Sequence, residues 1–326
     1  MRLAVSFLLA LHLLAQSASP DPLDALAAEA ESYGLRVGSP VTSEFKNARR
    51  LLRLLVEAVS KGATPALDVD RTRLEAIVRW LRVNGESVKD VSASPFDRMP
   101  FFGRATVKGN VLYLHVFAWP SSNQLKVPGL AAEIVSAQLL ATGSPLRWSR
   151  SGDTTFVDLP DKPPDEVASV IKLSLKSPPL VQPYFIEPDE RGVITAGVES
   201  CEIEARSGKM AFKENSPGHV FLANWKRAVD VPTWKVRMPR AGRYSVEMRY
   251  AAGPSSAGVV YTVTMKGQTV GMTKGIVEST GNLYKTLPAG DMQLDAGNYM
   301  LLIQPENTAG QTAMSLERVI LKRIGE

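Results

Sequence analysis

Two stretches in the first quarter of the chain repeat apolar residues at the spacing of a helix. The segment 43–62 predicts an amphipathic helix with an apolar stripe of Leu51, Leu52, Leu55, Val56 and Val59. The segment 71–84 predicts a second helix with a stripe of Leu74, Ile77, Val78 and Leu81. Between them, Thr64–Val69 has room for one short strand or an extended connection.

Residues with capping preferences bound both helices. Ser43 and Asp70 have the side chains favoured at an N-cap. Gly62 suits the position after the first helix, and Gly85 is expected to close the second. Upstream, the lead-in 19–42 is polar and rich in Ala, and Pro22–Ser32 within it predicts a short helix.

From Phe96 the period changes to that of β-strands. Val111–Phe117 is rich in β-branched and aromatic residues, and Gly109-Asn110 before it is a two-residue hairpin signal. Further strands are predicted at Leu125–Pro128, Glu133–Leu140, Leu146–Arg150, Thr154–Leu159 and Val167–Leu175. Short strands at this spacing predict an antiparallel β-sandwich over 91–176.

A Pro-rich stretch, 177–192, is expected to be a semi-rigid linker. The remainder, 193–326, predicts a second sandwich. Its clearest strand, Tyr244–Ala251, alternates apolar and polar residues. Other strands are expected at Trp234–Met238, Val259–Met265, Tyr284–Leu287, Asn298–Ile303 and Ala313–Leu321. The predicted fold class is therefore mainly β: two antiparallel, jelly-roll-like sandwiches after a short helical segment.

The N-terminus has the pattern of a secretory signal peptide, residues 1–18. Arg2 gives a positive start, Leu3–Leu14 is apolar, and Ala15–Ala18 supplies small residues for cleavage. The alternative is an uncleaved anchor. No other stretch is long and apolar enough to span a membrane, so we expect a secreted or periplasmic protein.

The composition fits an ordinary globular protein, with 44% hydrophobic and 22% charged residues among 326. The formal charge is +5, and the densest basic cluster is Arg49, Arg50 and Arg53. A solvated helix face explains this cluster better than a nucleic-acid interface does. The single cysteine, Cys201, cannot form an intrachain disulfide and is expected to be a buried thiol.

Several motifs resemble the C-terminal part of the α-L-fucosidases of glycoside hydrolase family 29. They are Val59-Ser60-Lys61-Gly62, Asn84-Gly85-Glu86, Phe102–Thr106, Leu112–Pro120 and Val127–Leu130. In that family, a last barrel helix ending in such an Asn-Gly-Glu tripeptide leads into a β-sandwich. The resemblance implies that 43–90 is a remnant of the last strand–helix unit of the barrel.

The same resemblance implies that the catalytic barrel is missing. A (β/α)8 barrel takes roughly 250 residues, and the segment 19–95 is far shorter. No position matches the family's catalytic carboxylates. We therefore expect a protein that is related to fucosidases but is not itself a glycosidase, a pseudoenzyme.

Other candidate catalytic groups have simpler explanations. Glu86 and Asp90 lie after a helix and in a loop, which gives no rigid carboxylate pair. Asp68 and Asp70 lack the further ligands of a calcium loop. His115 lies in an apolar strand and is expected to be a buried structural residue. We predict no catalytic residue, metal or cofactor, with calcium in the second sandwich left open.

The second sandwich carries the candidate ligand residues. Its turn-and-strand phrases at Arg240–Tyr244 and Leu294–Tyr299 resemble jelly-roll carbohydrate-binding modules of families 6 and 35. Aromatic faces bind sugar rings and amides bind hydroxyl groups. The predicted ligand-binding residues of these two types are Asn224, Trp225, Asn282 and Tyr284. For Trp225, Asn282 and Tyr284 a core position is the alternative, and Trp234 is expected in the core. Ser315 replaces the Asn that often contacts ligand in those modules.

These observations lead to one function and two alternatives. The first is a secreted, non-catalytic protein that binds carbohydrate, with a fucosylated glycan as one candidate, or another surface. The second is an accessory part of a split fucosidase, docking a separately encoded barrel through the apolar stripes of 43–84. The third is a decayed fragment without ligand. We expect neither a nucleic-acid partner nor a membrane-spanning segment.

Overall fold

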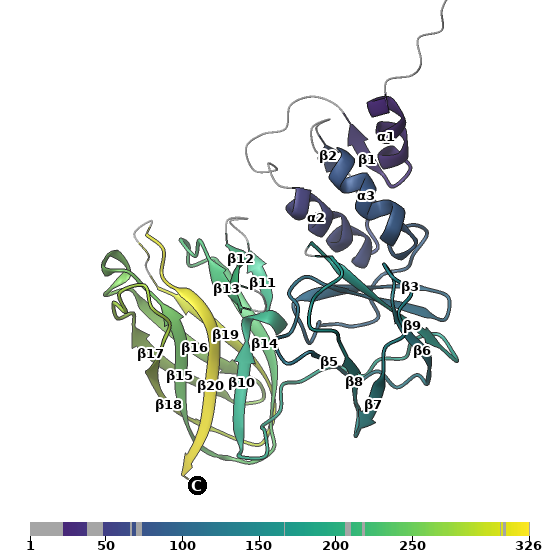
Figure 1. The fold of residues 1–326 in the computed structure, drawn as a ribbon. Helices are drawn as coiled ribbons and strands as arrows, with labels where there is room; N and C mark the ends of the chain where they lie inside the picture. The colour runs from purple at the N-terminus through teal and green to yellow at the C-terminus, as the bar shows by residue number, and fades with distance from the viewer. Residues whose placement is uncertain are drawn as a thin grey trace, which may run out of the picture.

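The computed structural model describes residues 22–37, 48–65, 67–69, 74–165, 167–205, 210–216, 219–306, 308 and 311–325. Two β-sandwiches lie side by side, and a small helical unit covers one end of the first (Figure 1). The structure is mainly β, as predicted. The expected signal peptide and the expected caps Ser43 and Asp70 lie outside the described residues.

In its described residues the helical unit contains three helices and two short parallel strands. In chain order these are α1 (Pro22–Glu31), β1 (Leu35–Val37), α2 (Ala48–Ser60), β2 (Leu67–Val69) and α3 (Leu74–Asn84). Strands β1 and β2 pair in parallel, with Leu35 opposite Leu67. The lead-in was expected to hold only a helix, so β1 is an addition to the predicted strand–helix unit.

The apolar stripes of α2 and α3 are buried within the chain itself. All nine stripe residues have exposed fractions of 8% or less. Trp80 of α3 donates its indole N–H to the carbonyl of Ala168, 2.9 Å away, which fastens the helices to the first sandwich. The prediction that these stripes form an exposed docking face is therefore wrong, because they are buried in the chain's own hydrophobic core.

Arg53 also departs from the expected solvated helix face. Its guanidinium lies over the neighbouring rings of Phe102 and Phe117, 5.2 and 5.1 Å from their centroids. Its Nη2 donates to the carbonyl of Phe117 at 2.6 Å. A cation close to two aromatic rings is attracted by both, so Arg53 joins α2 to the sheet below it.

The two helix-ending glycines differ. Gly62 has a φ of 72° and ends α2 as predicted. After α3 the chain instead continues into a 3₁₀ turn, Gly85–Ser87. A Cβ at Gly85 would lie 2.3 Å from the hydroxyl of Tyr33. Gly85 is thus required by the close approach of Tyr33 rather than by a left-handed backbone.

The first sandwich has a four-stranded and a three-stranded sheet. Their strands are β3 (Gly103–Lys108), β4 (Val111–Val116), β5 (Gln124–Pro128), β6 (Ile134–Leu139), β7 (Trp148–Ser151), β8 (Thr154–Asp158) and β9 (Ser169–Leu175). The sheet orders are β3-β4-β9-β6 and β5-β8-β7. Gly109, with a φ of 58°, makes the predicted hairpin turn between β3 and β4.

Over the residues that the structure describes, the second sandwich has eleven strands. They are β10 (Val193–Gly197), β11 (Glu202–Ala205), β12 (Ala211–Ser216), β13 (His219–Ala223), β14 (Asp230–Met238), β15 (Gly242–Ala251), β16 (Val260–Lys266), β17 (Val270–Ile276), β18 (Lys285–Leu294), β19 (Gly297–Pro305) and β20 (Ser315–Gly325). One sheet runs β12-β13-β20-β15-β18, with β10 also on β20, and the other runs β11-β14-β19-β16-β17. Strands β10–β13 and β17 were not predicted.

The Pro-rich segment between the sandwiches contacts both. Val181 bridges to Leu130 of the first, and Ile186 bridges to Val236 of the second. Direct contacts reinforce the junction, because Arg98 donates to the carbonyl and the hydroxyl of Thr233, at 2.7 and 3.0 Å. These contacts fix the two sandwiches against each other.

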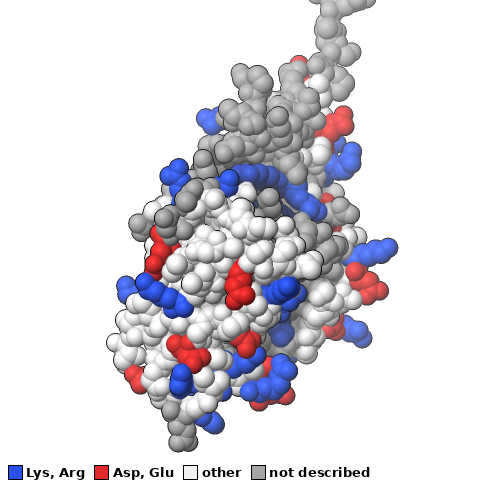
Figure 2. Space-filling view, turned by 90° about the vertical axis from the view of Figure 1, so that its left-hand side faces the viewer, with Lys and Arg blue, Asp and Glu red and all other residues white. Residues whose placement is uncertain are grey.

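Figure 2 shows positive and negative side chains interspersed over the second sandwich on the face seen there. Within the described residues, no helix is long and apolar enough to cross a lipid bilayer.

Candidate functional site

Three rings meet on the solvent-facing side of the six-stranded sheet. His219 and Phe221 alternate along β13 with the buried Val220 and Leu222, so their side chains point outward. The ring of Tyr284, just before β18, lies edge-on to both, with centroid distances of 4.7 Å to His219 and 5.8 Å to Phe221. Both Phe221 and Tyr284 are partly exposed.

A charged cluster adjoins the rings. The carboxylate of Glu317 on β20 pairs with His219 Nε2 at 3.2 Å, with Arg249 Nε at 2.9 Å and with Arg318. The side chain of Glu317 is only 7% exposed, whereas Arg249 and Arg318 are 36% and 42% exposed. The carboxylate therefore lies beneath the two guanidinium groups.

A β-bulge creates this arrangement. Arg318 pairs with Arg249 and Leu316 pairs with Tyr250, which leaves Glu317 as an extra residue on β20. Because of the extra residue, Glu317 lies among outward-facing groups while Leu316 and Val319 both stay in the core. Strand periodicity alone cannot show that two successive residues contribute to one face.

The charges on these groups follow from their neighbours. Burial alone raises the pKa of the Glu317 carboxyl, but the hydrogen bond and charge of Arg318, with His219 and Arg249, outweigh burial and hold the pKa below its usual value. Burial, with the charge of Glu317, raises the pKa of Tyr284 to about 12. Near neutral pH, Glu317 is thus ionised and the Tyr284 phenol is neutral.

A cleft of about 350 Å³ opens beside the cluster, between the two sandwiches. It shares His219, Glu317 and Arg318 with the cluster. The first sandwich contributes an aromatic and hydroxyl wall that includes Phe101, Trp119, Ser121 and Ser122. The volume falls in the range of small-molecule sites.

Glu199 lines the cleft and is accessible to solvent there. Crowding by the walls desolvates its carboxyl group and raises the pKa. The carboxylate lies over Gly197, where a Cβ would be 2.1 Å from Glu199 Oε1. A glycine at 197 is therefore what lets the Glu199 side chain occupy its position.

The structure separates the four residues predicted from the sequence. Tyr284 belongs to the ring cluster, and the exposed Asn282, two residues before it, has a left-handed φ of 62°. Trp225 is fully buried and donates its indole N–H to the carbonyl of Asp230 at 2.9 Å, so its faces are closed to a ligand in this structure. Asn224 is exposed, with a φ of 57°.

Trp234 lies in the core, as predicted, with its indole N–H on the carbonyl of Gly197 at 2.8 Å. His219, Phe221, Arg249 and Glu317 were missed. The alternation of His219 and Phe221 with Val220 and Leu222 could have indicated a strand with an outward-facing aromatic residue, but β13 was not predicted.

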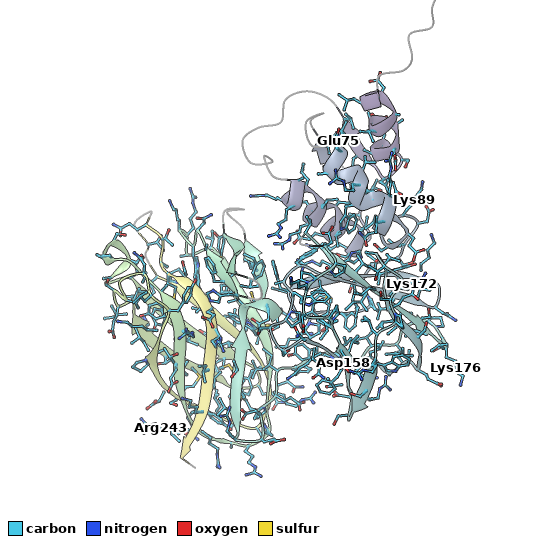
Figure 3. All side chains as sticks on the ribbon, viewed as in Figure 1. Glu75, Lys89, Asp158, Lys172, Lys176 and Arg243 are labelled. Carbon is cyan, nitrogen blue, oxygen red and sulfur yellow. The ribbon has the colours of Figure 1, made fainter. Side chains whose placement is uncertain are left out.

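The structure also describes three other residues considered in the sequence analysis, Glu86, Asp90 and His115. Glu86 pairs with Lys172 of β9, labelled in Figure 3, at 2.8 Å, and Asp90 occupies a turn with a φ of 55°. His115 is completely buried, as expected, with Nε2 3.1 Å from the hydroxyl of Thr106. Among the residues that the structure describes, no group of three or more His, Cys, Asp or Glu side chains is arranged to hold a metal ion.

Comparison with solved structures shows a fold similar to that of α-L-fucosidases. The α-L-fucosidase from Vibrio sp. strain EJY3 matches 88% of this chain and 54% of its own, at 17% identity and a TM-score of 0.50. The chain thus spans about half the length of that enzyme, and at this identity the similarity is one of fold. At the level of the fold it supports the predicted relation to α-L-fucosidases, while the assignment to their C-terminal part stays a prediction.

Shorter parts match α-L-fucosidase isoenzyme 1 from Paenibacillus thiaminolyticus, at 26% identity and a TM-score of 0.39, over 44% of this chain and 39% of that one. The Thermotoga maritima α-fucosidase matches at 19% identity and a TM-score of 0.34, over 39% of this chain and 34% of that one. No protein-family model matches the chain. No curated protein sequence matches it either.

Proposed function

We propose that this chain is a secreted, non-catalytic carbohydrate-binding protein related to the C-terminal part of a fucosidase. The observation that carries the proposal is the cluster of Tyr284, Phe221 and His219 beside the Glu317 carboxylate on an outer sheet face. The proposal includes a cleaved signal peptide and a secreted or periplasmic location, and both are supported by the signal-peptide pattern of residues 1–18.

The chemistry of the cluster suits a sugar. Partly exposed aromatic rings offer apolar surface to the C–H face of a pyranose. Arg249 and Arg318 offer hydrogen-bond donors, and the Glu317 carboxylate beneath them holds their side chains in place. The adjoining cleft gives room for a further part of the ligand.

The proposal that the chain is not a glycosidase rests on the frame around its carboxylates. The part of the chain described by the structure contains three helices and one pair of parallel strands, β1 and β2, in addition to its antiparallel sheets. A barrel active site draws on the ends of several parallel strands. Two three-residue strands offer too little frame for such a site.

The test is ligand binding by the purified mature chain. A glycan array, followed by calorimetry with the best oligosaccharides, is expected to give binding that Tyr284→Ala weakens tenfold or more. Trp148→Ala is the matched control, because Trp148 is 40% exposed on the first sandwich, away from the cluster. Absence of binding to every glycan contradicts the proposal and favours a fragment without ligand. Release of nitrophenol from a nitrophenyl fucoside by the chain alone contradicts its non-catalytic part.

One observation favours the split-fucosidase alternative. Among the described residues, β1 and β2 pair only with each other, so both outer edges of this parallel pair offer unpaired backbone groups. In this form of the hypothesis the strand edges, rather than the buried helix stripes, contact a separately encoded barrel. The alternative predicts that fucosidase activity appears only when such a barrel protein is mixed with this chain. The substitution Arg36→Pro in β1 is then expected to abolish that activity.

A further inference from the structure

The cluster on the outer sheet face has more positive than negative groups. One carboxylate, that of Glu317, serves Arg249, Arg318 and the imidazole of His219. Elsewhere on the same face the pairs are one to one: Lys322 pairs with Glu247 and Arg243 pairs with Asp291. The imbalance is therefore local to the cluster.

Arg249 has the free donors. Its Nε hydrogen-bonds to Glu317, and among the described residues its two terminal nitrogens have no hydrogen-bond partner. The side chain is 36% exposed. A guanidinium with one edge held and the other open presents a fixed pair of N–H donors, the geometry that matches a carboxylate or a sulfate.

The nearby acidic groups leave the open edge of Arg249 uncovered. Glu317 is covered, at 7% exposed, and a ligand approaching from solvent meets the guanidinium groups first. Glu199 in the adjoining cleft acts on Arg318. The Tyr284 phenol stays neutral at neutral pH because burial raises its pKa to about 12, so it does not repel an anion.

We infer that the cluster binds an anionic saccharide, one whose ring carries a carboxylate or a sulfate ester. The inference rests on the proposed carbohydrate-binding function and names the class of sugar. The anionic group binds the open edge of Arg249, and the ring packs on Tyr284 and Phe221. Charge-assisted hydrogen bonds of this kind are roughly twice as strong as neutral ones.

The experiment compares three short oligosaccharides by calorimetry: a uronic acid trisaccharide, its carboxyl-reduced neutral form, and a sulfated form of the neutral trisaccharide. We expect at least one anionic form to bind ten or more times tighter than the neutral form in 50 mM salt, with the ratio falling in 500 mM salt. The uronate and sulfate arms show which anion is preferred. The neutral form is expected to retain weak binding through the rings.

Variants of two arginines on one strand assign the effect. Arg249→Gln is expected to abolish the preference for the anionic form, so that the anionic and neutral forms bind with similar affinity. Arg243→Gln is the matched control, because Arg243 lies on the same strand, about 20 Å away at 3.3 Å per residue, and is paired with Asp291 (labelled in Figure 3). Arg249→Lys keeps the charge but loses the paired donors. Its affinity for the anionic form is expected to lie between those of the wild type and Arg249→Gln.

The outcomes separate the two proposals. Equal binding of neutral and anionic forms overturns the anionic inference and leaves the carbohydrate-binding function standing. An anionic preference that survives Arg249→Gln with normal circular dichroism also overturns it. Failure of all three forms, and of every glycan on the array, overturns the proposed function and the inference with it.

Discussion

The buried imidazole of His115 should make the stability of the folded chain depend on pH. His115 lies on β4 with no exposed surface. The Thr106 hydroxyl donates to the carbonyl of Ser87 at 2.6 Å, so it can only accept from His115 Nε2–H at 3.1 Å. Nδ1 is then the unprotonated nitrogen, and among the described residues it has no hydrogen-bond partner. Protonation would place an unpaired charge inside the sandwich.

The magnitude follows from proton linkage. Burial lowers the pKa of His115 from 6.5 to about 3, against a smaller opposing effect of the hydrogen bond to the Ser87 backbone. Between these values the unfolded chain binds a proton that the folded chain does not. The free energy of unfolding therefore falls with falling pH, by about 1.4 kcal/mol per pH unit from this residue alone. From pH 6.5 to pH 4 the loss is about 3 kcal/mol.

Urea denaturation of the wild type and His115→Gln at pH 7, 6, 5 and 4 measures this effect. Carboxyl groups contribute equally to both proteins, so the variant is expected to lose about 3 kcal/mol less over this range, whatever its stability at pH 7. His219→Gln, which removes a partly exposed imidazole, is expected to keep the steeper slope. Parallel curves for wild type and His115→Gln would refute the reasoning. If His115→Gln does not fold, the wild type alone still provides a test. An NMR signal of His115 that titrates near pH 6.5 in the folded wild type would also refute the reasoning.

Three further predictions concern the junction and the cleft. Gly197→Ala is expected to cost about 1–3 kcal/mol by crowding the Glu199 carboxylate, and a double-mutant cycle with Glu199→Ala should recover part of that loss. Arg98→Met removes two charge-assisted hydrogen bonds to Thr233 and is expected to lower the free energy of unfolding by about 2–4 kcal/mol, measured by chemical denaturation. Burial raises the pKa of the Cys201 thiol well above its ordinary value, so a thiol reagent at pH 8 should react only after denaturant is added.

The sequence predicted the elements whose pattern is long or whose turn is specific. Helices α2 and α3 have apolar stripes, and Gly109-Asn110 marks the β3–β4 hairpin. Strand β1 was missed because three residues cannot show an alternation. Strand β17 was missed because its pattern is inverted: Val270, Met272 and Ile276 are more than half exposed, while the intervening glycines face the sheet packing.

The inverted pattern of β17 has a steric cause. A Cβ at Gly271 would lie 2.5 Å from Leu294, and a Cβ at Gly275 would lie 2.2 Å from the hydroxyl of Tyr261. Large side chains of neighbouring strands occupy the space that side chains of β17 would need. A rule that places apolar residues in the core cannot predict the exposed apolar side chains of β17. The space on its core-facing side is filled by side chains of other strands.

The candidate site was only partly predictable. Tyr284 was identified as an aromatic near a turn, but its partners His219 and Phe221 come from a strand more than sixty residues earlier. Pairing across that distance carries no local signal. Trp225 follows an exposed turn residue, yet it is fully buried and donates its indole N–H to the carbonyl of Asp230, so its neighbour's exposure did not predict its own.

The bulge at Glu317 makes the ionic cluster independent of the core. Without residue 317, Leu316 and Arg318 would become neighbours. Core-facing and solvent-facing side chains would then alternate regularly along the strand through Val319. A chain shortened by that one residue should therefore fold with its interior intact and its register preserved, yet carry two unanchored guanidinium groups. The surface chemistry of this sheet thus depends on one surplus residue that the architecture can do without.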